Sequence, residues 1–182
     1  MKILNFGSCN LDFVYLVEHI VRPGETIETK ELHKYPGGKG LNQSIALARA
    51  GAEVYHAGCV GKDDDLLRKL LQENGVNVSY LKEVDECTGQ AIIQVEESGE
   101  NCIFLYHGAN FAVSREQIDS VFSHFEPGDV LLLQNEISEI SYLVKRGKEL
   151  GFQIFLNPSP FNAVMQEIDL HQIDYLILNQ TE

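Results

Sequence analysis

The chain has 182 residues, 44% of them hydrophobic, a length that suits one packed core and is short for two full-sized domains. Its 14 Lys and Arg residues against 27 Asp and Glu residues give a formal net charge of −13. This charge would repel a polyphosphate backbone, so nucleic acid is not expected as a partner.

Short apolar runs rich in branched residues alternate with longer stretches of helical period, as is typical of βαβ units around a largely parallel sheet. The runs predict core strands at residues 3–6, 54–57, 130–133, 153–156 and 175–178. The stretches of helical period predict helices at residues 42–49, 64–73, 115–125 and 141–150. Gly51 and Gly75 mark two helix ends, and Ser114 with Gln117 forms a capping box.

Two further stretches interrupt this alternation. Residues 13–17 and 26–33 flank the turn residues Arg22-Pro23-Gly24, and residues 90–96 and 101–107 flank residues 97–100. Both stretches resemble hairpins or paired strands. They predict a small β layer outside the main sheet.

The four cysteines, Cys9, Cys59, Cys87 and Cys102, show neither a C-x-x-C pair nor a zinc-like spacing with the histidines, which indicates reduced, mostly buried thiols. The apolar run at the N-terminus is too short for a secretory signal, and nowhere do 18 apolar residues follow one another. We therefore expect a cytoplasmic protein with no membrane partner.

A glycine-rich segment from Pro36 to Ser44 leads from a strand into an apolar helix. Its glycines would let a ligand approach backbone N–H groups at the positive end of that helix, where Lys39 adds a mobile charge. The spacing matches neither a Walker loop nor a dinucleotide fingerprint. Taken alone, such a segment is more often a turn than a binding site.

Asn10 and Asp12 follow the first predicted strand, where polar groups of an open α/β sheet face the ligand crevice. Two positions apart, they can point to the same side. An amide beside a carboxylate suits neighbouring hydroxyls of a sugar, because the carboxylate accepts two hydrogen bonds. The alternative interpretation of an isolated Asn-x-Asp is an Asx turn.

Taken together, the two segments resemble the ribokinase, or phosphofructokinase-B type, carbohydrate kinase family. Matches in the family's order occur at Gly7-Ser8-x-Asn10-x-Asp12, Pro23-Gly24-Glu25-Thr26, Gly37-Gly38-Lys39-Gly40-x-Asn42-Gln43 and Ala48-Arg49-Ala50-Gly51-Ala52. They continue through Gly58-Cys59-Val60-Gly61-Lys62-Asp63, Thr88-Gly89-x-Ala91, Gly99-Glu100-Asn101, Gly108-Ala109-Asn110, Leu133-Gln134-Asn135-Glu136 and Leu156-Asn157-Pro158-Ser159-Pro160. The ordered set spans the whole chain and is far more specific than any single match.

The resemblance implies a ribokinase-like three-layer α/β/α fold over residues 1–182, with lid segments at about residues 12–35 and 88–108. It places Asn10 and Asp12 on sugar hydroxyls, with backbone or wall contacts from Leu11. A second sugar-contacting segment would contain Gly38, Lys39, Gly40, Leu41 and Asn42. Lys39 would also meet the transferred phosphoryl group, and Glu136 matches a carboxylate near the sugar. The alternative role of Glu136 is an acid at a helix N-terminus.

The last four residues, Asn179 to Glu182, match the family's Asn-x-x-Glu motif. By the resemblance, Asn179 lies near the phosphates of ATP, and Glu182 helps to organise magnesium through water, an oxygen-ligand role that suits this ion. The alternative is a frayed end without fixed geometry.

A family member continues into a nucleotide-binding half with a Gly-Ala-Gly-Asp segment, whose aspartate is the catalytic base, and a monovalent-cation loop for potassium. The resemblance therefore assigns no catalytic base to these 182 residues, and we expect this chain alone to be nearly inert as a kinase. We also expect a homodimer through the β lid, or self-association through the sheet edge at residues 175–178.

The leading hypothesis is ATP-dependent phosphorylation of a small sugar, with ribose favoured because Gly-Gly-Lys-Gly-x-Asn-Gln is nearest to the ribokinase pattern. A nucleoside kinase or another sugar kinase of the same family is the near alternative. A non-catalytic sugar-binding or interaction fragment is the alternative of a different class. A nicotinamide-binding Rossmann domain fails, because the glycine fingerprint is missing after the first strand.

Overall fold

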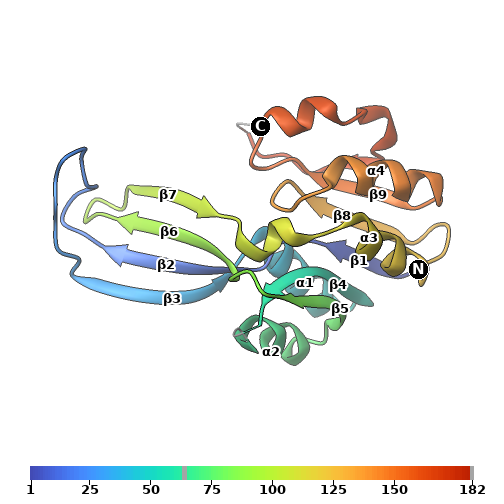
Figure 1. The fold of residues 1–182 in the computed structure, drawn as a ribbon, viewed down its shortest axis with the longest axis horizontal. Helices are drawn as coiled ribbons and strands as arrows, with labels where there is room; N and C mark the ends of the chain where they lie inside the picture. The colour runs from blue at the N-terminus through green and yellow to red at the C-terminus, as the bar shows by residue number, and fades with distance from the viewer. Residues whose placement is uncertain (63–64, 181–182) are drawn as a thin grey trace.

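The computed structural model describes residues 1–62 and 65–180, which form a layered body and a second sheet that projects from it (Figure 1). The main sheet has six parallel strands in the order β10-β9-β8-β1-β4-β5. These strands are β1 (Ile3–Phe6), β4 (Val54–Gly61), β5 (Asn77–Val84), β8 (Val130–Gln134), β9 (Gln153–Asn157) and β10 (Tyr175–Leu176).

Helices cover both faces of this sheet. On one face α1 (Lys39–Arg49) and α2 (Asp65–Glu73) bury Leu41, Leu67 and Leu71 in a common apolar cluster. On the other face α3 (Arg115–Phe122) and α4 (Ile140–Glu149) pack against β1 and β8 in a larger cluster. The buried strands thus lie between two helical layers, and the predicted three-layer α/β/α fold is confirmed.

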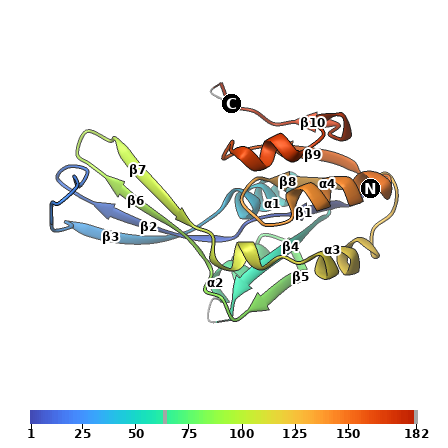
Figure 2. The same cartoon turned by 45° about the horizontal axis from the view of Figure 1, so that its top comes forward.

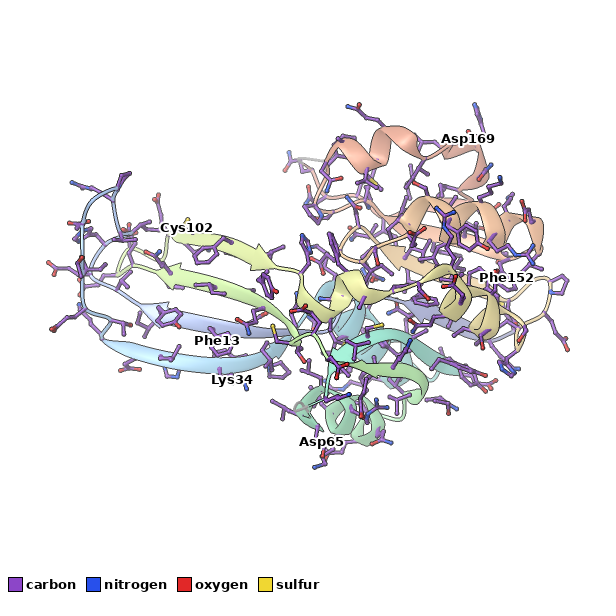
Figure 3. All side chains as sticks on the ribbon, viewed as in Figure 1. Phe13, Lys34, Asp65, Cys102, Phe152 and Asp169 are labelled. Carbon is purple, nitrogen blue, oxygen red and sulfur yellow. The ribbon has the colours of Figure 1, made fainter. Side chains whose placement is uncertain are left out.

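The second sheet has four strands in the order β3-β2-β6-β7. They are β2 (Asn10–Leu16), β3 (Glu31–Gly37), β6 (Gly89–Val95) and β7 (Asn101–Tyr106). Figure 2 shows them extending side by side away from the main sheet. Phe13 of β2 and Lys34 of β3 are register partners on this sheet, with Lys34 Nζ 5.7 Å from the centre of the Phe13 ring (Figure 3). The predicted small β layer is therefore present.

Short 3₁₀ helices complete the chain: η1 (Gly108–Ala112) after β7, then η2 (Ala163–Glu167) and η3 (Leu170–Gln172) between β9 and β10. The predicted capping box at α3 is half formed: the Ser114 side chain accepts a hydrogen bond from Gln117 N, whereas the Gln117 side chain bonds Gly58 O and Cys59 Sγ. Gly51 and Gly75 adopt φ of 90° and 80°, as helix-terminating glycines do.

The second sheet differs from its prediction at one strand. β3 occupies Glu31–Gly37, whereas the sequence predicted residues 26–33. β3 is an edge strand, where proline is tolerated, and Pro36 lies opposite Leu11 of β2.

Other boundaries also differ from the prediction. Strand β5, at an edge of the main sheet, was not predicted, and α3 ends at Phe122, three residues early. Helix α1 begins at Lys39, because Gly38 with φ of 98° forms its N-cap. The predicted start of α2 at Asp64 lies outside the described residues.

The core strand predicted at residues 175–178 is present only in part, as a short strand that pairs with β9 but is not buried. Only Tyr175 and Leu176 form β10, and their side chains are 55% and 44% exposed. The prediction of mostly buried cysteines was half right, because Cys9 and Cys59 are buried whereas Cys87 and Cys102 are exposed; none of the four forms a disulfide. Among the described residues, no helix combines the length and apolarity needed to cross a bilayer.

Candidate functional site

The connections of the main sheet change direction between β1 and β8, its two central neighbours. From β1 the chain goes on to β4 and β5 on one side, and from β8 it goes on to β9 and β10 on the other. In open α/β sheets, such a switch point opens a crevice outside the carboxyl ends of the strands. Ser8 follows β1 and Glu136 follows β8, so both lie at this crevice.

Glu136 is the centre of the site. It is 4% exposed, and its Oε2 accepts hydrogen bonds from Ser8 Oγ at 2.5 Å and from Lys39 N at 3.1 Å. Its Oε1 accepts a hydrogen bond of 2.6 Å from Lys39 Nζ, and the two side chains form an ion pair. A buried carboxylate needs such compensation. Glu136 therefore joins the ends of β1 and β8 to the start of α1.

Asp12, on β2, belongs to the same electrostatic cluster. Burial raises the pKa of its carboxyl group above the ordinary value, Glu136 raises it further, and Lys39 partly offsets the two. A side chain at Gly37 would collide with the Asp12 carboxylate, so the Asp12 side chain packs against the segment that leads into α1. The structure thus brings Asp12, Lys39 and Glu136 together.

Asn10 lies on the same face of β2 as Asp12, two positions earlier, and is 6% exposed. Its Oδ1 accepts a hydrogen bond of 2.7 Å from Asn110 Nδ2. A Cβ at Gly38 would be 3.0 Å from Asn10 N, so this residue too borders the glycine-rich segment. Asn10 and Asp12 therefore face the start of α1 from one side.

The open backbone amides expected at the start of α1 are not present. Gly40 N donates to Ser8 Oγ at 3.2 Å, Leu41 N to Ser8 O at 2.9 Å and Asn42 N to Gly38 O at 3.0 Å. The glycines instead permit close packing, because a Cβ at Gly40 would collide with the backbone of Ser8 and Gly7. The first amides of α1 thus donate to residues of the site, and they bind the start of the helix to Ser8.

The remaining predicted site residues are spread more widely. The side chains of Leu11 and Leu41 are buried in the apolar cluster of α1 and α2, away from the polar side chains of the site. Asn42 is exposed on the first turn of α1. Asn179 is exposed three residues after β10, and Glu182 lies outside the described residues.

A buried polar network supports these segments from below. Asn5 Nδ2 donates to Gly40 O at 2.7 Å and to Ser44 Oγ at 2.8 Å. Ser44 Oγ lies 2.8 Å from His56 Nδ1, and His56 Nε2 lies 3.2 Å from Cys9 Sγ. Burial lowers the pKa of His56 to about 4, so the imidazole is neutral near pH 7. The network ties β1, α1 and β4 together.

Sequence reasoning missed the roles of three of these residues, although their motifs were visible. Ser8 stands in the Gly7-Ser8-x-Asn10 motif and Asn110 in Gly108-Ala109-Asn110, but neither was named as a site residue. His56 has no local signal in the sequence. Their roles depend on neighbours far along the chain.

The side chains of the cluster carry groups that can form hydrogen bonds with hydroxyls. Carboxylates accept hydrogen bonds from hydroxyls, while the ammonium of Lys39 and the amide of Asn10 can donate to hydroxyl oxygens. Within residues 1–62 and 65–180, no three His, Cys, Asp or Glu side chains gather as metal ligands. The described part of the site thus offers polar contacts and no metal centre.

Known proteins resemble this chain along its whole length. It is 34% identical to the ribokinase of Haemophilus influenzae over 181 residues, covering 97% of this chain and 59% of that protein. The ADP-bound crystal structure of ribokinase from Cryptococcus neoformans has a TM-score of 0.86 at 36% identity and covers all of this chain and 59% of that one.

A ribokinase of Arabidopsis thaliana complexed with ribose and ATP has a TM-score of 0.77 at 29% identity, covering 96% of this chain and 59% of that one. The chain thus spans about three fifths of the length of these relatives. The family model described as pfkB family carbohydrate kinase matches residues 1–182. From this match over its full length, the chain belongs to the pfkB family of carbohydrate kinases.

Proposed function

We propose that this chain forms the sugar-binding part of a kinase that transfers a phosphoryl group from ATP to a small sugar, with ribose as the substrate. The observation that carries the proposal is the convergence of Asp12, Lys39 and Glu136 at the crevice between β1 and β8. The ribokinases among the relatives support ribose as the first sugar to test.

In this proposal Asn10 and Asp12 hold sugar hydroxyls from β2, and Lys39 and Glu136 hold them from the opposite side. Gly38, Gly40, Leu41 and Leu11 contribute backbone and close packing, and Asn42 reaches the sugar from the first turn of α1. The phosphoryl acceptor is a hydroxyl in this crevice. The Lys39 ammonium has three N–H donors, so it can donate to the incoming phosphoryl group while it keeps its ion pair with Glu136.

ATP and magnesium belong to the proposal through Asn179 and Glu182. Asn179 is exposed, and Glu182 lies outside the described residues. Potassium and the catalytic base would be held by parts of the relatives that this chain does not match. A cytoplasmic location suits the four cysteines, none of which forms a disulfide.

Two measurements on the 182-residue chain test the proposal. Calorimetric titration with ribose should give a saturable heat, and addition of ATP with ribose should release no ADP above background. Sugar-dependent ADP release by this chain would contradict the assignment of the base to another segment. A chain that binds neither ribose, 2-deoxyribose nor a nucleoside would overturn the sugar-binding assignment.

We propose that the second sheet acts as a lid over the sugar and pairs with the lid of a second copy. The face that carries Asp12 also carries Val14, Ile93, Ile103 and Leu105, as the strand registers place them in line. Ile103 and Leu105 are 53% and 38% exposed, which leaves apolar surface for a partner.

Light scattering tests the dimer. Ile103→Glu should convert a dimer to a monomer, whereas Phe104→Glu, on the opposite face of the same strand and 56% exposed, should not. A monomeric wild-type chain would overturn pairing through the lid. Equal self-association of both variants would point to the exposed edge around β10 instead.

A further inference from the structure

Asn110, in η1, is a buried residue whose side chain bonds Cys9 and Asn10, at the start of β2. It is 1% exposed, and its Oδ1 accepts a hydrogen bond of 3.0 Å from Cys9 N. Its Nδ2 donates to Asn10 Oδ1 at 2.7 Å and to Cys9 O at 3.3 Å. Asn110 thus grips the start of β2 from 100 positions further along the chain.

The Cys9 amide fixes the orientation of both asparagine side chains. A backbone N–H can only donate, so the Asn110 group facing it must be the oxygen. Nδ2 of Asn110 then faces Asn10, which must present its own oxygen to that donor. The orientation of an amide normally has to be assigned from its network, and here a donor that cannot reverse supplies the assignment. Nδ2 is therefore the group that Asn10 can offer to a ligand.

The contact between the Asn10 and Asn110 side chains requires a glycine at position 89, the register partner of Asn10 on β6. A Cβ at Gly89 would collide with both Asn110 Nδ2 and Asn10 Oδ1. The contact between the two amides thus depends on a missing side chain as well as on the two asparagines.

Resting on the proposed function, we propose that Asn110 is a positioning residue that fixes Asn10 as a hydrogen-bond donor to the sugar. Asp12, two positions along the same face, is an acceptor when ionised. The two side chains therefore present a donor next to an acceptor. This pair fits two neighbouring hydroxyls, one of which receives a hydrogen bond from Asn10 while the other donates to Asp12.

Asn110→Asp replaces the Nδ2 donor that faces Asn10 by an acceptor, and it keeps an oxygen for the hydrogen bond from Cys9 N. One oxygen of the new carboxylate still accepts from Cys9 N, but the other faces Asn10 as an acceptor. Asn10 then turns its Nδ2 toward the carboxylate and offers Oδ1 to the sugar. We expect the Kd for ribose, measured by calorimetry, to rise roughly 10- to 100-fold, the effect of losing one buried hydrogen bond.

The matched control is Gln90→Glu, which adds the same charge one residue from Gly89. Gln90 lies on the other face of the second sheet, where it lines a cavity of about 390 Å³ with Leu11 and Lys34. The Kd of the Gln90→Glu variant for ribose should stay within about twofold of the wild-type value. Equal ribose affinities of wild type and Asn110→Asp would overturn the proposal.

A second measurement does not depend on a variant that folds. In ¹H–¹⁵N spectra of the free wild-type chain, the Asn110 side-chain amide protons should exchange slowly and those of Asn10 quickly, and ribose should slow the latter. Protection of Asn10 and not Asn110 in the free chain would overturn the orientation. Failure of wild type to bind ribose would instead reject the proposed function. The exchange rates of the free chain would still test how the Asn10 and Asn110 side-chain amides are oriented.

Discussion

Ser8 and Glu136, 128 positions apart in the sequence, are joined by a hydrogen bond of 2.5 Å between Ser8 Oγ and Glu136 Oε2. The same Ser8 hydroxyl accepts a hydrogen bond from Gly40 N at 3.2 Å. A single buried hydroxyl thus connects the end of β1, the start of α1 and the residue that follows β8. Its removal leaves a buried amide and a buried carboxylate each without one partner.

Ser8→Ala should therefore lower the free energy of unfolding by about 3 kcal/mol, since each unsatisfied buried group costs about 1–3 kcal/mol. Urea denaturation at pH 7 measures the change. Ser123→Ala removes an exposed hydroxyl that donates to Ser120 O, and should change stability by less than about 0.5 kcal/mol. Equal stabilities of the two variants would show that Ser8 does not hold the site together.

Asp12→Asn should make the protein more stable at pH 7 and weaken ribose binding. The pKa of Asp12 is raised in the folded state, so its stabilising contribution is present below its unfolded pKa and is lost as the pH rises through the folded pKa. At pH 7 the ionised carboxylate therefore opposes folding, and asparagine lacks this effect. The gain should shrink as the pH falls and Asp12 becomes protonated.

Thermal unfolding at pH 7 and pH 4, with calorimetric titration of ribose, measures both effects, and affinity should fall at least roughly 10-fold. Asp85→Asn is the control of opposite sign, because Lys62 holds the pKa of that exposed carboxyl below its usual value. It should give no gain in stability. A less stable Asp12→Asn variant at pH 7 would contradict the assigned direction.

Local patterns in the sequence predicted the helices and the buried central strands, because their apolar periods are set by one layered core. They did not predict β5 (Asn77–Val84), where Ser79, Lys82 and Glu83 interrupt the apolar run of an edge strand. They also placed β3 at residues 26–33, whereas it occupies Glu31–Gly37. Its strand includes Pro36, which an edge strand tolerates, and edge position is a property of the whole fold.

The candidate site was predictable as a set of residues but not as a set of bonds. Asn10, Asp12 and Lys39 were identified from adjacent polar and glycine-rich segments. The ion pair between Lys39 and Glu136 joins residues 97 positions apart, and Ser8 takes up the amide of Gly40 that was expected to face a ligand. Such partners follow from the meeting of β1, β8 and α1, which no local pattern encodes.

Gly40→Ala should unfold or strongly destabilise the chain, although alanine is the better helix former. The added Cβ would collide with backbone atoms of Ser8 and Gly7, which no side-chain rotation can relieve. We expect a loss of about 3 kcal/mol, at the upper end for overpacking. Ala46→Ser, exposed on the same helix, should stay within about 0.5 kcal/mol of wild type in urea denaturation. A Gly40→Ala variant as stable as Ala46→Ser would refute the close approach of α1 to β1.

His56 should make stability fall between pH 6.5 and pH 4. Its pKa is 6.5 as a free side chain and about 4 in the folded chain, where burial disfavours the imidazolium. The stabilising contribution is thus present above pH 6.5 and is lost as the pH falls to about 4, because the unfolded state binds the proton first. At about 1.4 kcal/mol per pH unit, the loss from this residue approaches about 3 kcal/mol.

Urea denaturation at pH 7.5, 5.5 and 4.5 measures this slope. His56→Gln should be less stable than wild type at pH 7.5, because the bonds to Ser44 and Cys9 are disturbed, but it should lose less stability on acidification. His171→Gln, at an exposed position, should retain the wild-type slope. If wild type and His56→Gln lose stability in parallel, another group is responsible for the acid sensitivity, and the neutral buried imidazole does not control it.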